Sequence, residues 1–361
     1  EEFGKKEYAS FLKIDFFLQP NMKGIFEGEL TADEILKRMT AYVRDFELIP
    51  GNTLIFLDEI QCSGNARTAV KYLAMDFRVD VISSGSLLGL TYGEDDDEAV
   101  EIPESVPVGY ETQITMHSLD FEEFLWADGY DAAAIDALKS YYTSGATIPA
   151  AIHEKYERLF REFIVVGGMP EVVQDFINNR DYKRVREIQK TILASYENDF
   201  SKHVPANTVE KIRMLWQTIP SQLAKENKKF IYSAIKKGGR AKEFENAIQW
   251  LINAGLVHKV FRIKKFEQPL KFYEDFDCFK LYVNDLGLLG AMAQAPTSEI
   301  LVGNSAFSSY KGSFTEQYVA QQFFSANSGD VILKSSSMGV LKINNGYTVN
   351  LTNIDFKDYT I

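Results

Sequence analysis

The sequence predicts an α/β protein in which a parallel sheet near the amino end precedes a long helical region. Four apolar residues, Leu54–Leu57, lead directly into Asp58 and Glu59. An unbroken apolar run of this kind is typical of a strand buried on both faces, as in parallel sheets. The other expected strands, 11–16 and 79–83, alternate with expected helices, which indicates crossover connections between parallel strands.

The expected elements follow from apolar periodicity and from turn residues. Residues 1–7 are expected to end a helix, and 112–116 to form a fourth strand, after which Ser118 caps a new helix. The remaining helices of the first two thirds are expected at 32–46, 66–75, 132–142, 152–166, 170–178, 181–200 and 209–225. Gly167-Gly168 and Pro170 separate two of these helices, which explains the glycines without a phosphate contact.

The pattern of expected elements changes after residue 230. A short helix at 231–236, a turn at Gly238-Gly239 and a helix at 242–254 precede strands at 256–262 and 279–283. Helix, turn, helix and hairpin in this order indicate a winged-helix domain. One more helix is expected at 312–324, with a β-rich segment after 328.

The composition of the chain limits the classes of function that it can have. The chain has 361 residues, 45% hydrophobic and 25% charged, and a net charge of −12, as in ordinary globular proteins. No apolar run is long enough to cross a bilayer, so no membrane association is expected. Cys62 and Cys278 match no metal spacing and suit a reducing, cytoplasmic location, and the four histidines predict no zinc site. Because the chain is acidic, any binding to nucleic acid has to be local.

The two acidic residues after Leu57 are the main candidates for metal binding and catalysis. Ligands of parallel sheets bind at the carboxyl ends of the strands, where Asp58 and Glu59 are expected. Asp58 there can hold a Mg²⁺ ion bound to nucleotide phosphates, and Glu59 can orient or deprotonate the attacking water. The alternative is that both acids only cap a loop. The phosphate loop that such a site needs, GxxxxGK[ST], occurs nowhere in the 361 residues.

Further motifs narrow the interpretation. Eight short motifs follow one another along the chain, namely Leu54-Ile-Phe-Leu-Asp-Glu-Ile-Gln61, Ser84-Gly-Ser-Leu-Leu-Gly89, Pro107-Val-Gly109, Leu119-Asp-Phe-Glu-Glu-Phe124, Gly167-Gly-Met-Pro-Glu171, Gly238-Gly-Arg240, Glu274-Asp-Phe276 and Leu281-Tyr-Val-Asn-Asp-Leu-Gly-Leu-Leu289. In this order they resemble a family of prokaryotic, archaeal-type AAA ATPases of the P-loop class, which carry a carboxyl-terminal winged-helix and restriction-endonuclease-like region. The resemblance covers roughly residues 1–325.

The resemblance implies ATP and Mg²⁺ as ligands. Asp58 would be the Walker B aspartate on the metal side, Glu59 the catalytic glutamate, and Ser84 or Ser86 the polar sensor of the γ-phosphate. In the family the phosphate loop directly precedes the helix matched by 1–8, so it is expected upstream of Glu1. The chain is therefore expected to hold a truncated P-loop sheet, inactive by itself, with a gap near Ser84 or extra chain filling it.

The resemblance also implies a division of the chain: a P-loop core at 1–128, a helical lid at 129–225, a winged-helix domain at 226–298 and a partial nuclease-like domain at 299–361. Glu316 would be the first acid of a nuclease site, with Asp355 a possible second, but the Glu-x-Lys pair of the family is missing. Two alternatives to the ATPase stay open. One is a module that binds DNA or a protein through the winged helix, with Lys236, Lys237 and Arg240 as basic contacts. The other is a metal-dependent nuclease.

Overall fold

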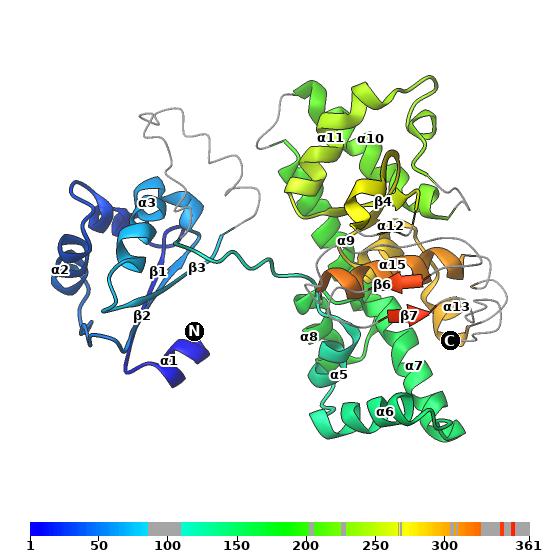
Figure 1. Cartoon of the computed structure of the whole chain (residues 1–361), viewed down its shortest axis with the longest axis horizontal. Helices are drawn as coiled ribbons and strands as arrows, with labels where there is room; N and C mark the ends of the chain where they lie inside the picture. The colour runs from blue at the N-terminus through cyan, green and yellow to red at the C-terminus, as the bar shows by residue number, and fades with distance from the viewer. Residues whose placement is uncertain are drawn as a thin grey trace. The chain divides into compact units, whose positions relative to one another are not determined.

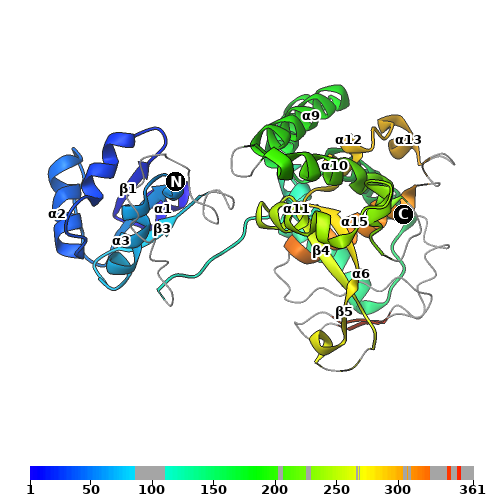
Figure 2. The same ribbon diagram turned by 90° about the horizontal axis from the view of Figure 1, so that it is seen from above.

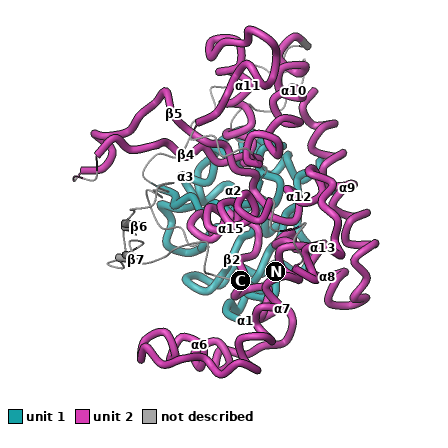
Figure 3. The backbone as a smooth tube through the Cα atoms, turned by 90° about the vertical axis from the view of Figure 1, so that its right-hand side faces the viewer, with its two compact units in different colours: residues 1–115 teal, residues 116–361 magenta. Residues whose placement is uncertain are grey.

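The computed structural model describes residues 1–85, 110–201, 206–224, 229–265, 267, 269–303, 307, 310–325, 340–342 and 348–350, the last two stretches and residue 206 as backbone only. These residues form two compact units, unit 1 at Glu1–Thr115 and unit 2 at Met116–Ile361 (Figure 3). The finer division of the chain at 128, 225 and 298 stays a prediction.

Unit 1 is an α/β unit built on a parallel sheet (Figure 1). Its elements are α1 (Glu2–Glu7), β1 (Ser10–Asp15), the 3-10 helix η1 (Pro20–Phe26), α2 (Ala32–Tyr42), β2 (Thr53–Asp58), the 3-10 helix η2 (Ile60–Cys62), α3 (Gly64–Ala74) and β3 (Asp80–Ser83). The strands lie in the order β1-β2-β3 and are parallel, with Asp15 beside Asp58 and Leu57 beside Ser83. The predicted parallel α/β sheet is thus confirmed, and its carboxyl ends are level.

The two faces of this sheet are covered differently. Alternate strand residues, among them Ile14, Ile55 and Leu57, are fully buried in one core with side chains of α2 and α3. Each such side chain contributes about 1.5–3 kcal/mol by burial. On the other face α1 comes so close that a Cβ on Gly4 would lie 2.4 Å from the ring of Phe11. The core therefore holds the strand ends in fixed positions.

Among the described residues the three strands pair without interruption, so no gap lies between them. The expected gap near Ser84, or extra chain filling it, concerns the outer side of β3 and stays a prediction. Each crossover in this unit puts the next strand beside the previous one, which leaves no space inside the set. Strand β3 forms one edge and exposes Asp80, Ile82 and Ser83. Within the described residues a further strand has room only at an edge, such as the one just before Ser84.

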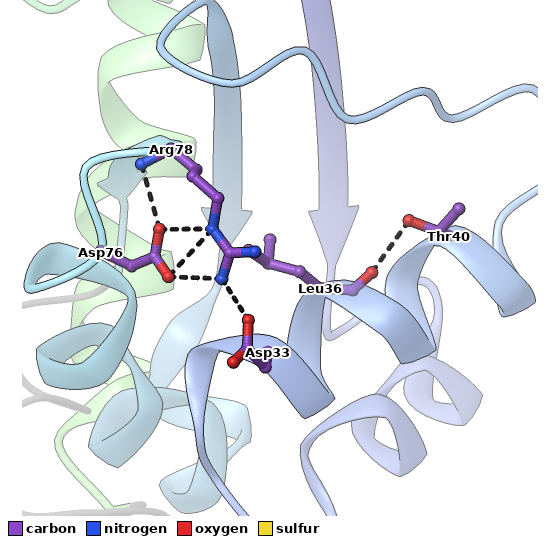
Figure 4. A network of polar contacts seen from close by, with 5 residues as sticks. All are labelled: Asp33, Leu36, Thr40, Asp76 and Arg78. Carbon is purple, nitrogen blue, oxygen red and sulfur yellow. Dashed lines mark hydrogen bonds and ion pairs between the residues drawn. The ribbon is translucent and has the colours of Figure 1, made fainter.

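An ion-pair network fixes the end of the sheet opposite to Asp58 (Figure 4). Arg78 lies between α3 and β3, and its guanidinium contacts Asp76 at 2.5 Å and Asp33 at 2.6 Å. Asp33 belongs to the first turn of α2, so the network links α2 to the turn that enters β3. The hydrogen bonds from Arg78 hold the pKa of the Asp76 carboxyl below its usual value, against the opposing effect of burial.

The fourth strand expected at 112–116 is absent, because 111–120 have no regular secondary structure. Ile114 and Met116 are 73% and 88% exposed, so no sheet face covers this segment. The next helix begins after Asp120 rather than after Ser118. Asp120 accepts a hydrogen bond from the Glu123 N–H, and the Glu123 carboxylate accepts one from the Asp120 N–H, which forms a capping box. The Ser118 hydroxyl instead donates to the carbonyl of Asn284 at 2.9 Å.

Unit 2 is mainly helical. Its helices are α5 (Phe121–Ala127), α6 (Ala132–Ser144), α7 (Ala150–Val166), α8 (Pro170–Asn179), α9 (Tyr182–Asp199), α10 (Ala206–Leu223), the 3-10 helices η3 (Tyr232–Ala234) and η4 (Leu270–Tyr273), α11 (Ala241–Asn253), α12 (Leu286–Met292), α13 (Thr297–Val302) and α15 (Lys311–Ser325). Its strands are β4 (Val257–Ile263), β5 (Glu274–Val283), β6 (Val340–Lys342) and β7 (Thr348–Asn350). Among the helices described, none has the length and apolar character needed to cross a bilayer.

Helix α12 lies in the core of unit 2. All residues from Leu286 to Ala291 are buried, and α12 packs against α7, α9 and α15. Sequence patterns did not predict this helix, because a short apolar run interrupted by glycines has no amphipathic period.

The hairpin β4–β5 projects from the body of unit 2 and carries η4 at its far end (Figure 2). It is antiparallel, with an irregularity between Phe261 and Arg262. Helix α11 precedes it and buries one face, including Phe244 and Trp250. The predicted order of helix, turn, helix and hairpin is present, although the first helix is reduced to the single turn η3. The winged-helix assignment itself remains a prediction.

Candidate functional site

Asp58 lies at the carboxyl end of β2, and groups from the two neighbouring strands surround its carboxylate. The Lys13 ammonium of β1 contacts Oδ2 at 2.8 Å, and the Ser84 hydroxyl, just after β3, donates to Oδ1. The backbone N–H of Ser84 donates to the Leu57 carbonyl at 2.9 Å, which fixes the position of the serine. The predicted residues Asp58 and Ser84 thus lie together at the carboxyl end of the sheet.

The electrostatics of this cluster favour a charged carboxylate. Partial burial of Asp58 acts to raise its pKa, but hydrogen bonds from Lys13 and Ser84 outweigh burial, so that the pKa lies below its usual value. The pKa of Lys13 is raised, first by its hydrogen bond to Asp58 and then by the one to Glu1. Asp58 is therefore an anion at neutral pH.

Glu59 adopts a backbone conformation that is rare for a residue with a side chain. Its φ of 52° and ψ of 46° lie in the left-handed region, which costs about 1–2 kcal/mol. The next N–H, of Ile60, donates to the Ser84 carbonyl at 3.0 Å, and Gln61 Nε2 donates to Glu59 Oε2 at 2.5 Å. Strained residues gather at functional sites, where the surroundings hold the strain.

Oxygen donors at this edge suit a hard cation. Mg²⁺ in nucleotide sites is commonly held by one or two carboxylates together with water and substrate phosphates. The Asp58 carboxylate with the Ser84 hydroxyl beside it meets this requirement. No cluster of three or more acidic, histidine or cysteine ligands occurs within the described residues, so here the protein alone offers no complete metal cage.

Lys13 is a member of this site that sequence reasoning missed. The signal was its charge in an otherwise apolar strand, Phe11-Leu-Lys-Ile. Leu12 and Ile14 point into the core, and strand alternation places Lys13 on the opposite face, the one that carries Asp58. Ser86, the other predicted sensor residue, lies outside the described residues.

The predicted basic contacts lie in unit 2. Lys236, Lys237 and Arg240 are exposed on the connection between η3 and α11, and no ion pair among the described residues of unit 2 involves them. Arg262 and Lys264 of the hairpin, in contrast, both contact Asp275, at 2.5 Å and 3.7 Å.

Glu316, the predicted nuclease acid, is engaged in polar contacts with β5. Its carboxylate contacts the Lys280 ammonium of β5 at 2.6 Å and accepts a hydrogen bond from the Tyr282 hydroxyl at 3.4 Å. Asp355 lies outside the described residues. The nuclease hypothesis stays a prediction, for which loss of DNA cleavage in Glu316→Ala is the test.

The two glycines at 167 and 168 lie in the buried core of unit 2. Gly168 N–H donates to Asp285 Oδ2 at 2.7 Å, and Leu119 N–H donates to the Gly168 carbonyl at 2.8 Å. A Cβ on Gly167 would lie 2.3 Å from Asp285 Oδ1, and one on Gly287 would lie 2.4 Å from the Val166 carbonyl. The motifs 167–171 and 281–289 therefore contact each other, and close packing accounts for the glycines.

Comparisons with known proteins match two separate parts of the chain. Residues 3–125 match a family model described as an AAA domain, and residues 157–299 match a model described as a domain of unknown function. No curated protein matches the chain. A solved structure, the Walker-type ATPase of Pyrococcus abyssi, is similar over 79% of this chain and 84% of that chain, with 12% identity and a TM-score of 0.41. So loose a similarity adds nothing to the argument, whereas the AAA match supports an ATPase-like unit 1.

Proposed function

We propose that unit 1 carries the Walker B half of an ATP-hydrolysing site. The observation that carries the proposal is the set of groups at the carboxyl edge of the sheet, where the Asp58 carboxylate is bonded to Ser84 and followed by the strained Glu59. The match of residues 3–125 to an AAA domain supports this assignment independently.

Each residue has a stated role in the proposal. Asp58 would hold the metal side of a nucleotide complex, and a bound Mg²⁺ would neutralise charge on the phosphates. Glu59 would orient and deprotonate the attacking water. The Ser84 hydroxyl, at the next strand end, would donate to the terminal phosphate. Gln61 Nε2 donates to the Glu59 carboxylate and so holds it in place.

The proposal also needs a phosphate loop. The 361 residues contain no GxxxxGK[ST], so the loop would have to come from a segment outside them. Backbone N–H groups and a lysine in that loop supply most of the contacts to nucleotide phosphates. We therefore expect the 361-residue chain by itself to show no ATP hydrolysis.

The test uses the protein extended by the residues that precede Glu1 in its gene, with the 361-residue chain measured beside it. Glu59→Gln should lower the rate of ATP hydrolysis by about 10²–10⁴-fold and leave ATP binding intact, because it removes only the base. Asp58→Asn should weaken binding of ATP in the presence of Mg²⁺. Glu29→Gln, an exposed acid of the same unit, is the matched control. Hydrolysis at an unchanged rate in Glu59→Gln would exclude this role.

A second candidate function is DNA binding by unit 2. It is favoured by the exposed Lys236, Lys237 and Arg240, and by Phe272, 82% exposed, on the projecting hairpin. Replacing the three basic residues with Ala should weaken DNA binding and reduce its salt slope by about one for each phosphate that is no longer neutralised. Lys190→Ala, on the exposed side of α9, is the control. DNA binding equal in both variants would exclude the three basic residues as DNA contacts.

A further inference from the structure

Both oxygens of the Asp58 carboxylate have a partner among the described residues. Its Oδ1 accepts a hydrogen bond from Ser84, and its Oδ2 contacts the Lys13 ammonium at 2.8 Å. The same ammonium contacts Glu1 Oε1 at 3.0 Å. The Lys13 and Asp58 side chains are only 29% and 22% exposed. A cation already occupies the position beside Asp58, and the protein itself supplies it.

The fold places this cation with little freedom. Lys13 lies opposite Phe56 in the β1–β2 pairing, and Asp58 lies two residues further along β2 on the same face. The backbone of β1 is held by its neighbours Leu12 and Ile14 in the core. Only the four methylenes of the lysine can move, and its ammonium lies 5.7 Å from the Phe56 ring. The ion pair is thus a built feature of the sheet rather than a chance contact between surface chains.

A divalent metal ion that binds Asp58 through Oδ2 has to approach the oxygen that the Lys13 ammonium already contacts. Two cations cannot share that oxygen without strong repulsion at such short distance. Glu1 offers the ammonium a second carboxylate, so Lys13 can leave Asp58 and still keep an ionic partner.

We propose that Lys13 is a positioning residue that holds the Asp58 carboxylate in the metal-free state and competes directly with the metal ion for it. The proposal rests on the proposed function, in which Asp58 faces the metal of a nucleotide complex. Lys13 thereby sets the affinity of the site for metal and keeps Asp58 paired when no metal is bound.

The test measures metal alone, on the 361-residue chain with labelled isoleucine methyl groups. Mn²⁺ broadens signals close to it, so the Ile60 methyl reports on Asp58, and Ile49, at the other end of β2, reports on non-specific binding and on the fold. Lys13→Met should lower the Mn²⁺ concentration that broadens Ile60 by about two- to fivefold, the factor for one partly exposed ion pair. Lys37→Met removes an equal charge from the exposed side of unit 1 and should leave the concentration unchanged. Asp58→Asn should remove the broadening.

The outcomes separate this proposal from the function on which it rests. If Lys13→Met behaves like Lys37→Met while Asp58→Asn still abolishes the broadening, competition by Lys13 is wrong and the metal role of Asp58 stands. If the broadening of Ile60 is the same in Asp58→Asn as in the parent chain, both are wrong.

Discussion

Replacement of Gly168 by Ala tests the packing that joins the two motifs of unit 2. A Cβ at this position would lie 1.9 Å from the Leu119 carbonyl oxygen, 2.7 Å from the Leu119 nitrogen and 2.8 Å from its carbonyl carbon. All three are backbone atoms, so no side-chain rotation relieves the overlap. The Leu119 segment has to move away from Gly168, or Gly168 away from it.

Either movement breaks hydrogen bonds that the structure defines. The one from Leu119 N–H to the Gly168 carbonyl, 2.8 Å, contributes about 1 kcal/mol. The hydrogen bond from Gly168 N–H to Asp285 is accepted by a fully buried carboxylate, so its loss costs about 1.5–3 kcal/mol. Alanine also restricts the unfolded chain more than glycine does, which offsets about 0.4–1 kcal/mol of this loss in stability. We expect Gly168→Ala to lower the free energy of unfolding by about 2–3 kcal/mol.

The assay is urea unfolding followed by tryptophan fluorescence. The three tryptophans, Trp126, Trp216 and Trp250, all belong to unit 2, so the signal reports on that unit. The matched control is Gly312→Ala in α15, because a Cβ there meets nothing within 4 Å. In a helix this change should raise stability by up to about 1 kcal/mol.

The comparison of the two variants decides the argument. If Gly168→Ala unfolds at the same urea concentration as the parent chain, or at a higher one as expected for Gly312→Ala, the close approach of Leu119 and Gly168 does not contribute to stability. The structural explanation of the glycine motif would then be wrong, and a ligand contact would again need testing.

Two further predictions concern charges. Burial, with a smaller effect from His117, lowers the pKa of His258 to about 4, below the value of about 6.5 in unfolded chains. The unfolded chain therefore binds more protons between these two pH values, so stability is lost as pH falls. From pH 7 to pH 5 the parent should lose about 2 kcal/mol more of its free energy of unfolding than His258→Gln, as measured by urea titration at each pH. Asp76→Ala should destabilise unit 1 by about 1–2 kcal/mol, whereas Asp33→Ala should do so by less than about 0.5 kcal/mol, since Asp33 is 83% exposed. Hydrogen exchange of residues 1–115 measures both effects, and equal effects would contradict this ranking.

Local patterns predicted the elements of unit 1 and most helices of unit 2. The apolar run before Asp58 is a strand, and α7, α8 and α9 begin and end within two residues of their expected limits. The errors fall where local signals agree with more than one structure. Residues 112–116 alternate like a strand, but a strand needs a partner edge, and the described part of the chain offers these residues none. Helix α12 was missed because its residues are buried on all sides, which removes the period that identifies a helix.

The chemistry available at the carboxyl end of the sheet can be read from the chain alone, because the identity and adjacency of Asp58 and Glu59 are properties of the chain. The parallel direction of the strands follows in the same way from apolar runs that alternate with helices. Which side chains from other strands meet Asp58 and Glu59 depends on the folded structure. Lys13 and Asp58 are 45 positions apart, and the register of β1 against β2 brings their charges to 2.8 Å. Contacts across strands depend on register and pleat, which no local pattern encodes.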